Sequence, residues 1–178
     1  MITDLDGLRT HVSNYAARCA EKLRQQGTVA SIVGVFLNTN AFREDLPQYW
    51  NFQEMRLVTP SSSTISIVKA ANEVLQKLYR QGYHYKKAGV IVMGIGPNSP
   101  IQQDLFDINA EQFEKMKRLD AVIDRINKVN GTETIVLGSQ QYTQKDGKGK
   151  ANVFANAIKH DFKSKNPTTR WSDIIILK

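Results

Sequence analysis

Apolar residues recur at intervals of three and four positions in three separate stretches of the chain. These stretches cover residues 5–23, 65–78 and 113–126. The interval places the apolar side chains on one side of a helix, so each stretch predicts an amphipathic helix. A glycine follows each stretch, and glycine just past the last turn is a common helix stop signal.

Segments of alternating polarity, rich in β-branched and aromatic residues, lie around the first two helices. They predict strands over residues 28–40, about 52–59 and 83–94. Because successive side chains of a strand point to opposite faces, Val33 and Val35 share one face of the first strand. Phe36 and Asn38 share the other face.

The order of these elements is helix, strand, strand, helix, strand. Two helices packed on one face of an antiparallel sheet leave the other face free, which makes the predicted class α+β. One more strand before the first helix would complete a split βαβ repeat. We therefore expect a sheet that lacks its first strand and has a vacant edge, through which two copies of the chain could also pair as a homodimer.

A turn-rich segment at residues 94–100 separates this unit from a second one. We expect a sheet domain over residues 1–97, a linker over 98–108 and a small α/β domain over 109–178. The elements expected in the second domain, after its first helix, are a short strand at 132–138, a polar loop at 140–150, a short helix at 153–162 and a last strand at 173–177.

The linker contains a short peptide suited to docking on another protein. The amide of Gln102 both donates and accepts hydrogen bonds, while Leu105 and Phe106 offer adjacent apolar groups to a cleft. This pentad looks like the motif by which bacterial DNA polymerases and repair factors hold the sliding clamp. Gln102, Asp104, Leu105 and Phe106 are the expected clamp contacts.

A local role for the same residues is the alternative. Asn109 can cap the third helix, and Ile108 can pack on Phe113 as a hydrophobic staple. Leu105 and Phe106 would then pack beneath the start of the helix.

Composition restricts the class of protein to which this chain can belong. The 178 residues carry a net charge of +7, which suits a polyanionic partner, and the most basic segment is the one that follows Thr143. A single cysteine excludes an internal disulfide framework. No apolar run approaches the ~20 residues of a membrane span, and no secretion signal is evident at the amino terminus. We expect a cytoplasmic protein.

The sequence carries no set of residues expected for catalysis, a metal or a cofactor. The Gly-Ile-Gly at residues 94–96 lacks the third glycine of a dinucleotide-binding loop, and the histidines lack metal-ligand spacing. Asp120 and Asp124 are one helical turn apart, but Lys117 and Lys128 are within reach. We expect surface ion pairs there and no metal pair.

Several segments in order resemble one family, and together they cover nearly the whole chain. They are residues 15–18 (YAAR), 21–24 (EKLR), 38–42 (NTNAF), 57–60 (LVTP), 83–90 (YHYKKAGV), the pentad at 102–106 and residues 168–171 (TTRW). This set is similar to the carboxyl-terminal part of the UmuC-type polymerases, members of the Y family of translesion DNA polymerases that act in SOS mutagenesis.

The resemblance implies that residues 1–97 form a little-finger domain that grips DNA and that the protein is associated with the nucleoid. It also implies that the metal-binding carboxylates of catalysis belong to a palm domain, so this chain alone is not expected to be an enzyme. The accessory dimer UmuD′ is a further implied partner.

We expect a flat polar surface on the free face of the sheet, which contacts phosphates without reading bases. The expected DNA contacts are Asn38, Thr39, Asn40, Arg56, Lys86 and Lys87. Lys86 and Lys87 could instead only keep an edge strand soluble. The alternative function is a stand-alone module that binds the clamp or UmuD′ without touching DNA, and a neutral free face would favour it.

Overall fold

A computed structural model describes residues 1–98, 110–131, 134–140, 144–145 and 151–152. The elements in chain order are α1 (Leu5–Gln25), β1 (Thr28–Thr39), β2 (Trp50–Ser61), α2 (Thr64–Leu78), β3 (Tyr85–Met93), β4 (Gly96–Pro97), α3 (Ala110–Asn130), the 3₁₀ turn η1 (Gly138–Gln140), β5 (Gln144–Lys145) and β6 (Ala151–Asn152).

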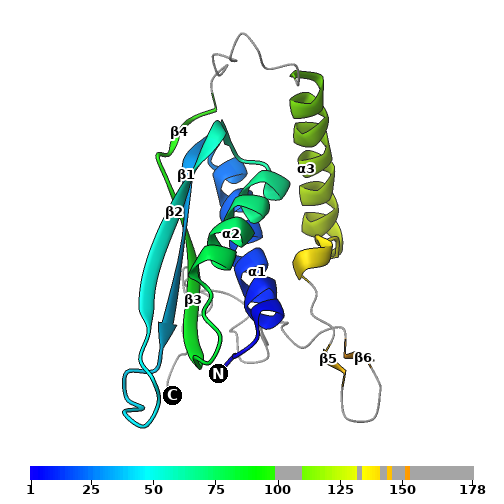
Figure 1. The fold of residues 1–178 in the computed structure, drawn as a ribbon. Helices are drawn as coiled ribbons and strands as arrows, with labels where there is room; N and C mark the ends of the chain where they lie inside the picture. Colours follow the sequence, from blue (N-terminus) through cyan, green and yellow to red (C-terminus); the bar gives the residue numbers. More distant parts are fainter. Residues whose placement is uncertain (99–109, 132–133, 141–143, 146–150, 153–178) are drawn as a thin grey trace, which may run out of the picture.

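β1 is the central strand of the main sheet, with β2 on one side and β3 on the other, both antiparallel. β4 pairs with the start of β1, beyond the end of β3. Helices α1 and α2 cover one face of the sheet, and α3 stands on the far side of these helices (Figure 1). The predicted fold class is therefore confirmed: an α+β, little-finger-like unit with two helices on one face of an antiparallel sheet.

The hydrophobic core lies between the sheet and the two helices that cover it. Val33, Val35 and Leu37 of β1 are fully buried, in one cluster with Leu8 of α1 and Leu75 of α2. Full burial of such a side chain contributes roughly 1.5–3 kcal/mol to folding. This face of the sheet is thus occupied by the core, and only the opposite face is available to a ligand.

Local signals set both ends of α1. The carboxylate of Asp4 accepts a hydrogen bond from the backbone N–H of Gly7 at 2.7 Å, which satisfies a donor of the first turn. Gly27 follows the helix with φ of 65°, a left-handed conformation that favours glycine. The chain can then turn directly into β1.

Ile2 forms an isolated β-bridge with Tyr85, at the edge of β3 that does not pair with β1. The N–H of Ile2 donates to the carbonyl of Tyr85 at 3.0 Å, and the N–H of Tyr85 donates back at 2.9 Å. Within the described ranges, no strand pairs with the edge of β3 from Lys86 onward. The edge that the sequence predicted to be vacant therefore lies at β3.

The second unit differs from its prediction. The short strand expected at residues 132–138 is not formed over 134–138, which turn into η1 instead. Asn127 explains this: its side-chain amide donates to the carbonyl of Ile135 at 3.0 Å and accepts from the N–H of Ile135 at 2.8 Å. A side chain of α3 thus takes the place of a strand partner.

The other expectations for residues 94–178 have mixed outcomes. Gly96 and Pro97, expected in a turn-rich segment, form β4, and the expected polar loop contains β5, which pairs with β6. The helix expected at 153–162 and the strand expected at 173–177 lie outside the described residues.

Candidate nucleic-acid interface

We call the face of the sheet opposite α1 and α2 the outer face. Pairing across the strands arranges its side chains in rows, with one residue each from β2, β1 and β3. The rows are Trp50 with Asn38 and Lys87, Phe52 with Phe36 and Gly89, Glu54 with Gly34 and Ile91, and Arg56 with Ile32 and Met93. Six residues along β1 separate the first row from the last, a length of ~20 Å.

Two phenylalanine rings lie across the backbone of neighbouring strands at the centre of the outer face. A Cβ atom on Gly34 would come 2.6 Å from Cε2 of Phe52, and one on Gly89 would come 2.3 Å from Cε1 of Phe36. Each ring therefore occupies the space that a side chain would need. Glycine inside a strand often marks such a close approach. Both phenylalanines remain partly exposed, so the centre of the face is aromatic and apolar.

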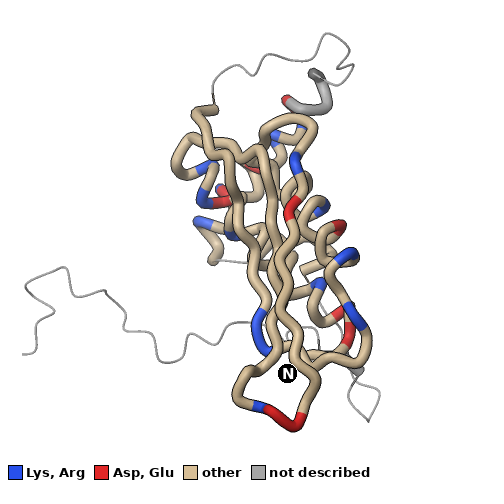
Figure 2. The backbone as a smooth tube through the Cα atoms, turned by 60° about the vertical axis from the view of Figure 1, so that its left-hand side comes forward, with Lys and Arg blue, Asp and Glu red and all other residues tan. Residues whose placement is uncertain are grey.

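Charged groups lie toward the ends of the outer face. Arg56 is exposed in the last row and Lys87 in the first, and neither forms an ion pair within the part of the chain that the structure describes. Glu54 is the one acidic residue of the four rows. In Figure 2 the long strands are uncharged along most of their length. The expected flat polar surface is therefore interrupted by the apolar row of Phe52, Phe36 and Gly89, with charged groups on both sides of that row.

The structure brings Asn38, Arg56 and Lys87 onto the outer face. Lys86 is exposed beside them, at the bulge where the pairing of β1 shifts between Lys87 and Tyr85. These residues reach solvent on or beside one face of the sheet, as phosphate contacts would require.

Thr39 and Asn40 do not join that group. Thr39 is 5% exposed, and its hydroxyl donates to the side chain of Gln48 at 2.9 Å. Asn40 lies past the end of β1, where its side chain accepts from the N–H of Phe42 at 3.3 Å. Both residues form hydrogen bonds within the connection between β1 and β2.

A family model described as the impB/mucB/samB family C-terminal domain matches residues 1–105, more than half of the chain. The chain belongs to the impB/mucB/samB family. A second model, a domain of unknown function (DUF4113), matches residues 117–177.

Relatives of this family match the chain over nearly all its length. UmuC of Salmonella typhimurium is 32% identical over 177 residues, which are 99% of this chain and 39% of UmuC. SamB of Salmonella typhimurium is 29% identical over 97% of this chain and 38% of SamB. MucB of Escherichia coli is 29% identical over 98% of this chain and 38% of MucB. The chain thus spans about two fifths of the length of these relatives.

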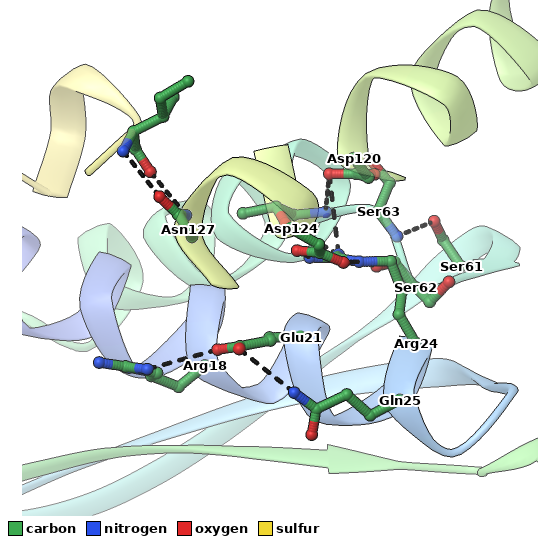
Figure 3. Close-up of polar contacts among 12 residues, drawn as sticks. Arg18, Glu21, Arg24, Gln25, Ser61, Ser62, Ser63, Asp120, Asp124 and Asn127 are labelled. Atoms are coloured by element: carbon green, nitrogen blue, oxygen red, sulfur yellow. Dashed lines mark hydrogen bonds and ion pairs between the residues drawn. The ribbon is translucent and has the colours of Figure 1, made fainter. Parts of the chain in front are cut away.

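In this member of the impB/mucB/samB family, an ion pair joins the two matched segments. Nε and Nη2 of Arg24 on α1 each donate to a carboxylate oxygen of Asp124 on α3, both at 2.6 Å (Figure 3). Burial disfavours the charge of Arg24, but the hydrogen bond to Asp124 and the charges of Asp120 and Asp124 outweigh it and raise the pKa of Arg24. The guanidinium therefore stays charged and holds α3 against α1.

Asp120 takes part in the same contact from a buried position. It is 3% exposed, lies 3.7 Å from Nη1 of Arg24 and accepts from the N–H of Thr64 at 3.3 Å. A carboxylate there complements the positive N-terminal end of α2. The expected surface pairs of Asp120 and Asp124 with Lys117 and Lys128 were therefore wrong: the partner is Arg24, from a helix distant in sequence.

A groove of about 790 Å³ lies between α1, α3 and residues 135–140. Its lining is mixed, with Arg24, Asp124 and Lys128 beside Ile123 and Leu137.

Among the residues that the structure describes, no group of acidic, histidine and cysteine side chains is arranged to hold a metal ion. No helix in those same ranges has the length and apolar character to cross a membrane.

The expected clamp contacts Gln102, Asp104, Leu105 and Phe106 lie outside the described residues. The aromatic centre of the outer face was not predicted from the sequence. The signal was present, because Gly34 and Gly89 interrupt two strands that otherwise favour larger residues, and Phe36 and Phe52 lie in the same segments.

Proposed function

We propose that this chain is the DNA-gripping and clamp-docking carboxyl-terminal region of a Y-family translesion DNA polymerase of the UmuC type, which acts in SOS mutagenesis. The observation that carries the proposal is the exposure of Arg56, Lys86 and Lys87 on and beside the outer face, in a chain of the impB/mucB/samB family. Copying damaged templates requires a grip that does not depend on the identity of the bases. Cations that contact phosphates provide such a grip.

The separation of the cations along the outer face is consistent with a grip on the DNA backbone. Arg56 and Lys87 are ~20 Å apart along the strands, so they would contact separate phosphates. The net charge of +7 adds a long-range attraction that brings DNA to the protein. A small number of phosphate contacts makes the isolated grip weak, and each contact adds about 0.9 to the slope of log affinity against log salt.

Docking on the sliding clamp through Gln102, Asp104, Leu105 and Phe106 would compensate for this weak grip. A peptide that binds in the micromolar range contributes on the order of −8 kcal/mol. Joining it to a second, weak contact with DNA multiplies the overall affinity by roughly 10² to 10⁴. Nucleotidyl transfer would require the remaining part of the polymerase, and UmuD′ would be a further partner of the assembled enzyme.

The second candidate function is a module that binds a protein without contacting DNA. The observation in its favour is the aromatic residues of the outer face, where Phe36 and Phe52 are partly exposed and Trp50, in the neighbouring row, is 70% exposed. Exposed aromatic residues of this kind are common at the centres of protein interfaces.

Binding of a fluorescent primer-template duplex to the whole chain tests the proposal. We expect binding at ~50 mM salt that weakens steeply by ~200 mM, because counterions compete for the phosphates. An affinity that does not change with salt, or no binding at low salt, would contradict the phosphate grip and favour the protein-binding module. A pull-down of the purified clamp then tests the second contact separately.

A further inference from the structure

We propose that the aromatic centre of the outer face stacks the unpaired bases of single-stranded DNA, while the cations near its ends hold the phosphates. The proposal deepens the function proposed above and rests on it. It concerns Phe36, Phe52 and Trp50, none of which the sequence suggested as a contact.

The two phenylalanine rings are fixed in a position suited to stacking. The outer part of the Phe52 ring, at Cε2 and Cζ, covers Gly34, and the same part of the Phe36 ring covers Gly89. Each ring therefore lies over a strand instead of projecting into solvent, and no side chain from the glycine lies beneath it. Both residues are partly exposed, so the side of each ring that faces away from the glycine is open to a ligand.

Trp50 extends this surface to the neighbouring row. It pairs with Asn38, directly beside the row that contains Phe36 and Phe52, and it is 70% exposed. Exposed aromatic faces on adjacent rows of a sheet form a platform on which successive bases can stack, and stacking tolerates any base because every base has a π face.

The charges on the outer face favour a nucleic acid over a neutral occupant. Lys87 lies in the first row beside Trp50 and Arg56 lies in the last, ~20 Å apart along the strands, with Phe36 and Phe52 in a row between them. This length accommodates a few nucleotides, with phosphates at the two cationic ends. Glu54, which lies between Phe52 and Arg56 on β2, disfavours phosphates near the centre and leaves that part of the face to bases.

A duplex does not fit this arrangement as well as a single strand. The bases of a duplex are already stacked and expose only their edges in the grooves, whereas a flat aromatic surface needs an accessible base face. The outer face is therefore expected to prefer a segment with unpaired bases, such as template that has not yet been copied.

The test compares two labelled oligonucleotides with the same number of phosphates, an oligothymidylate and its fully abasic analogue. The intact chain is expected to bind the oligothymidylate about tenfold more tightly, because each stacked base adds a substantial increment that the abasic strand lacks. Replacing both rings with leucine, Phe36→Leu with Phe52→Leu, should reduce this difference to the part that Trp50 alone supports and leave abasic binding unchanged. Leucine keeps the glycines covered by an apolar side chain.

The matched control replaces both cations, Arg56→Gln with Lys87→Gln, and should weaken binding of the two oligonucleotides by the same factor. Equal affinity of the unmodified chain for both oligonucleotides would overturn the stacking proposal and leave the phosphate grip standing. This comparison needs no variant, so it holds even where the leucine variant fails to fold. If neither oligonucleotide binds at low salt, the stacking proposal fails, and binding of the primer-template duplex at the same salt then decides the proposed function.

Discussion

Arg24 and Asp124, one hundred residues apart in the chain, form a two-point ion pair that joins α1 to α3. The side chain of Arg24 is 16% exposed and also donates to the carbonyl of Ser62 at 2.7 Å and to the hydroxyl of Thr64 at 2.9 Å. One guanidinium thus connects α1, the start of α2 and α3. The sheet domain and the domain of unknown function are therefore expected to move as one unit where the second half of α3 lies against α1.

A double-mutant cycle on this pair should show a strong coupling. We expect Arg24→Ala and Asp124→Ala to be coupled by about 1–2 kcal/mol in urea unfolding, because the hydrogen bonds are charged and partly shielded from water. The control is Asp6→Ala, which removes an exposed pair with Arg9 and should cost about 0.5 kcal/mol or less. Additive effects of Arg24→Ala and Asp124→Ala would show that the pair does not hold α3.

The glycines beneath the aromatic rings should not tolerate a methyl group. Gly89→Ala would place Cβ 2.3 Å from the ring of Phe36, so the ring must move, at a cost of about 1–3 kcal/mol measured by thermal unfolding. Gly96→Ala is the matched control, because no atom lies within 4 Å of the Cβ position there. Equal stability of the two variants would mean that the ring is not held against the strand.

Neutralising cations on the outer face should reduce the salt dependence of DNA binding. Arg56→Gln with Lys87→Gln removes two phosphate contacts and should lower the slope of log affinity against log salt by about 1.5–2. Lys69 and Lys77, exposed on α2, provide a control with the same change in net charge on the opposite side of the sheet. If the Lys69→Gln, Lys77→Gln variant shows the same decrease, the effect comes from net charge and not from the outer face.

The two predictions for the pentad lead to opposite results. If Leu105 and Phe106 dock on the clamp, Leu105→Ala with Phe106→Ala should abolish binding in a clamp pull-down and leave the melting temperature unchanged. If they pack beneath the start of α3, the melting temperature should fall. Gln103→Ala, at a spacer position, should leave both measurements as in the unmodified chain.

Acidification should destabilise the fold through His11. Burial lowers the pKa of His11 below its ordinary value of 6.5, so the unfolded chain binds a proton that the folded chain does not. The free energy of unfolding should therefore fall as the pH decreases below 6.5. His11→Gln removes this titration and should flatten the pH dependence in that range. An unchanged slope would assign the acid sensitivity to other groups.

The sequence alone was sufficient for the two helices and the three long strands of the first 98 residues and for the family. Hydrophobic periodicity identified both helices and the three long strands, because each of these segments buries one side and the buried side repeats at the period of the element. The alternation along β1 also assigned Phe36 and Asn38 to the same face. These features depend on residues close together in the chain.

Only the tertiary structure decided which side chains meet. Arg24, Asp120 and Asp124 come together because α3 packs beside α1, and no local pattern could favour Arg24 over nearer lysines as their partner. Likewise, Phe52 covers Gly34 only once β1 and β2 are paired in one register. Burial and contact across a hundred residues are properties of packing, which is why the sequence predicted a polar surface where the folded chain presents aromatic rings.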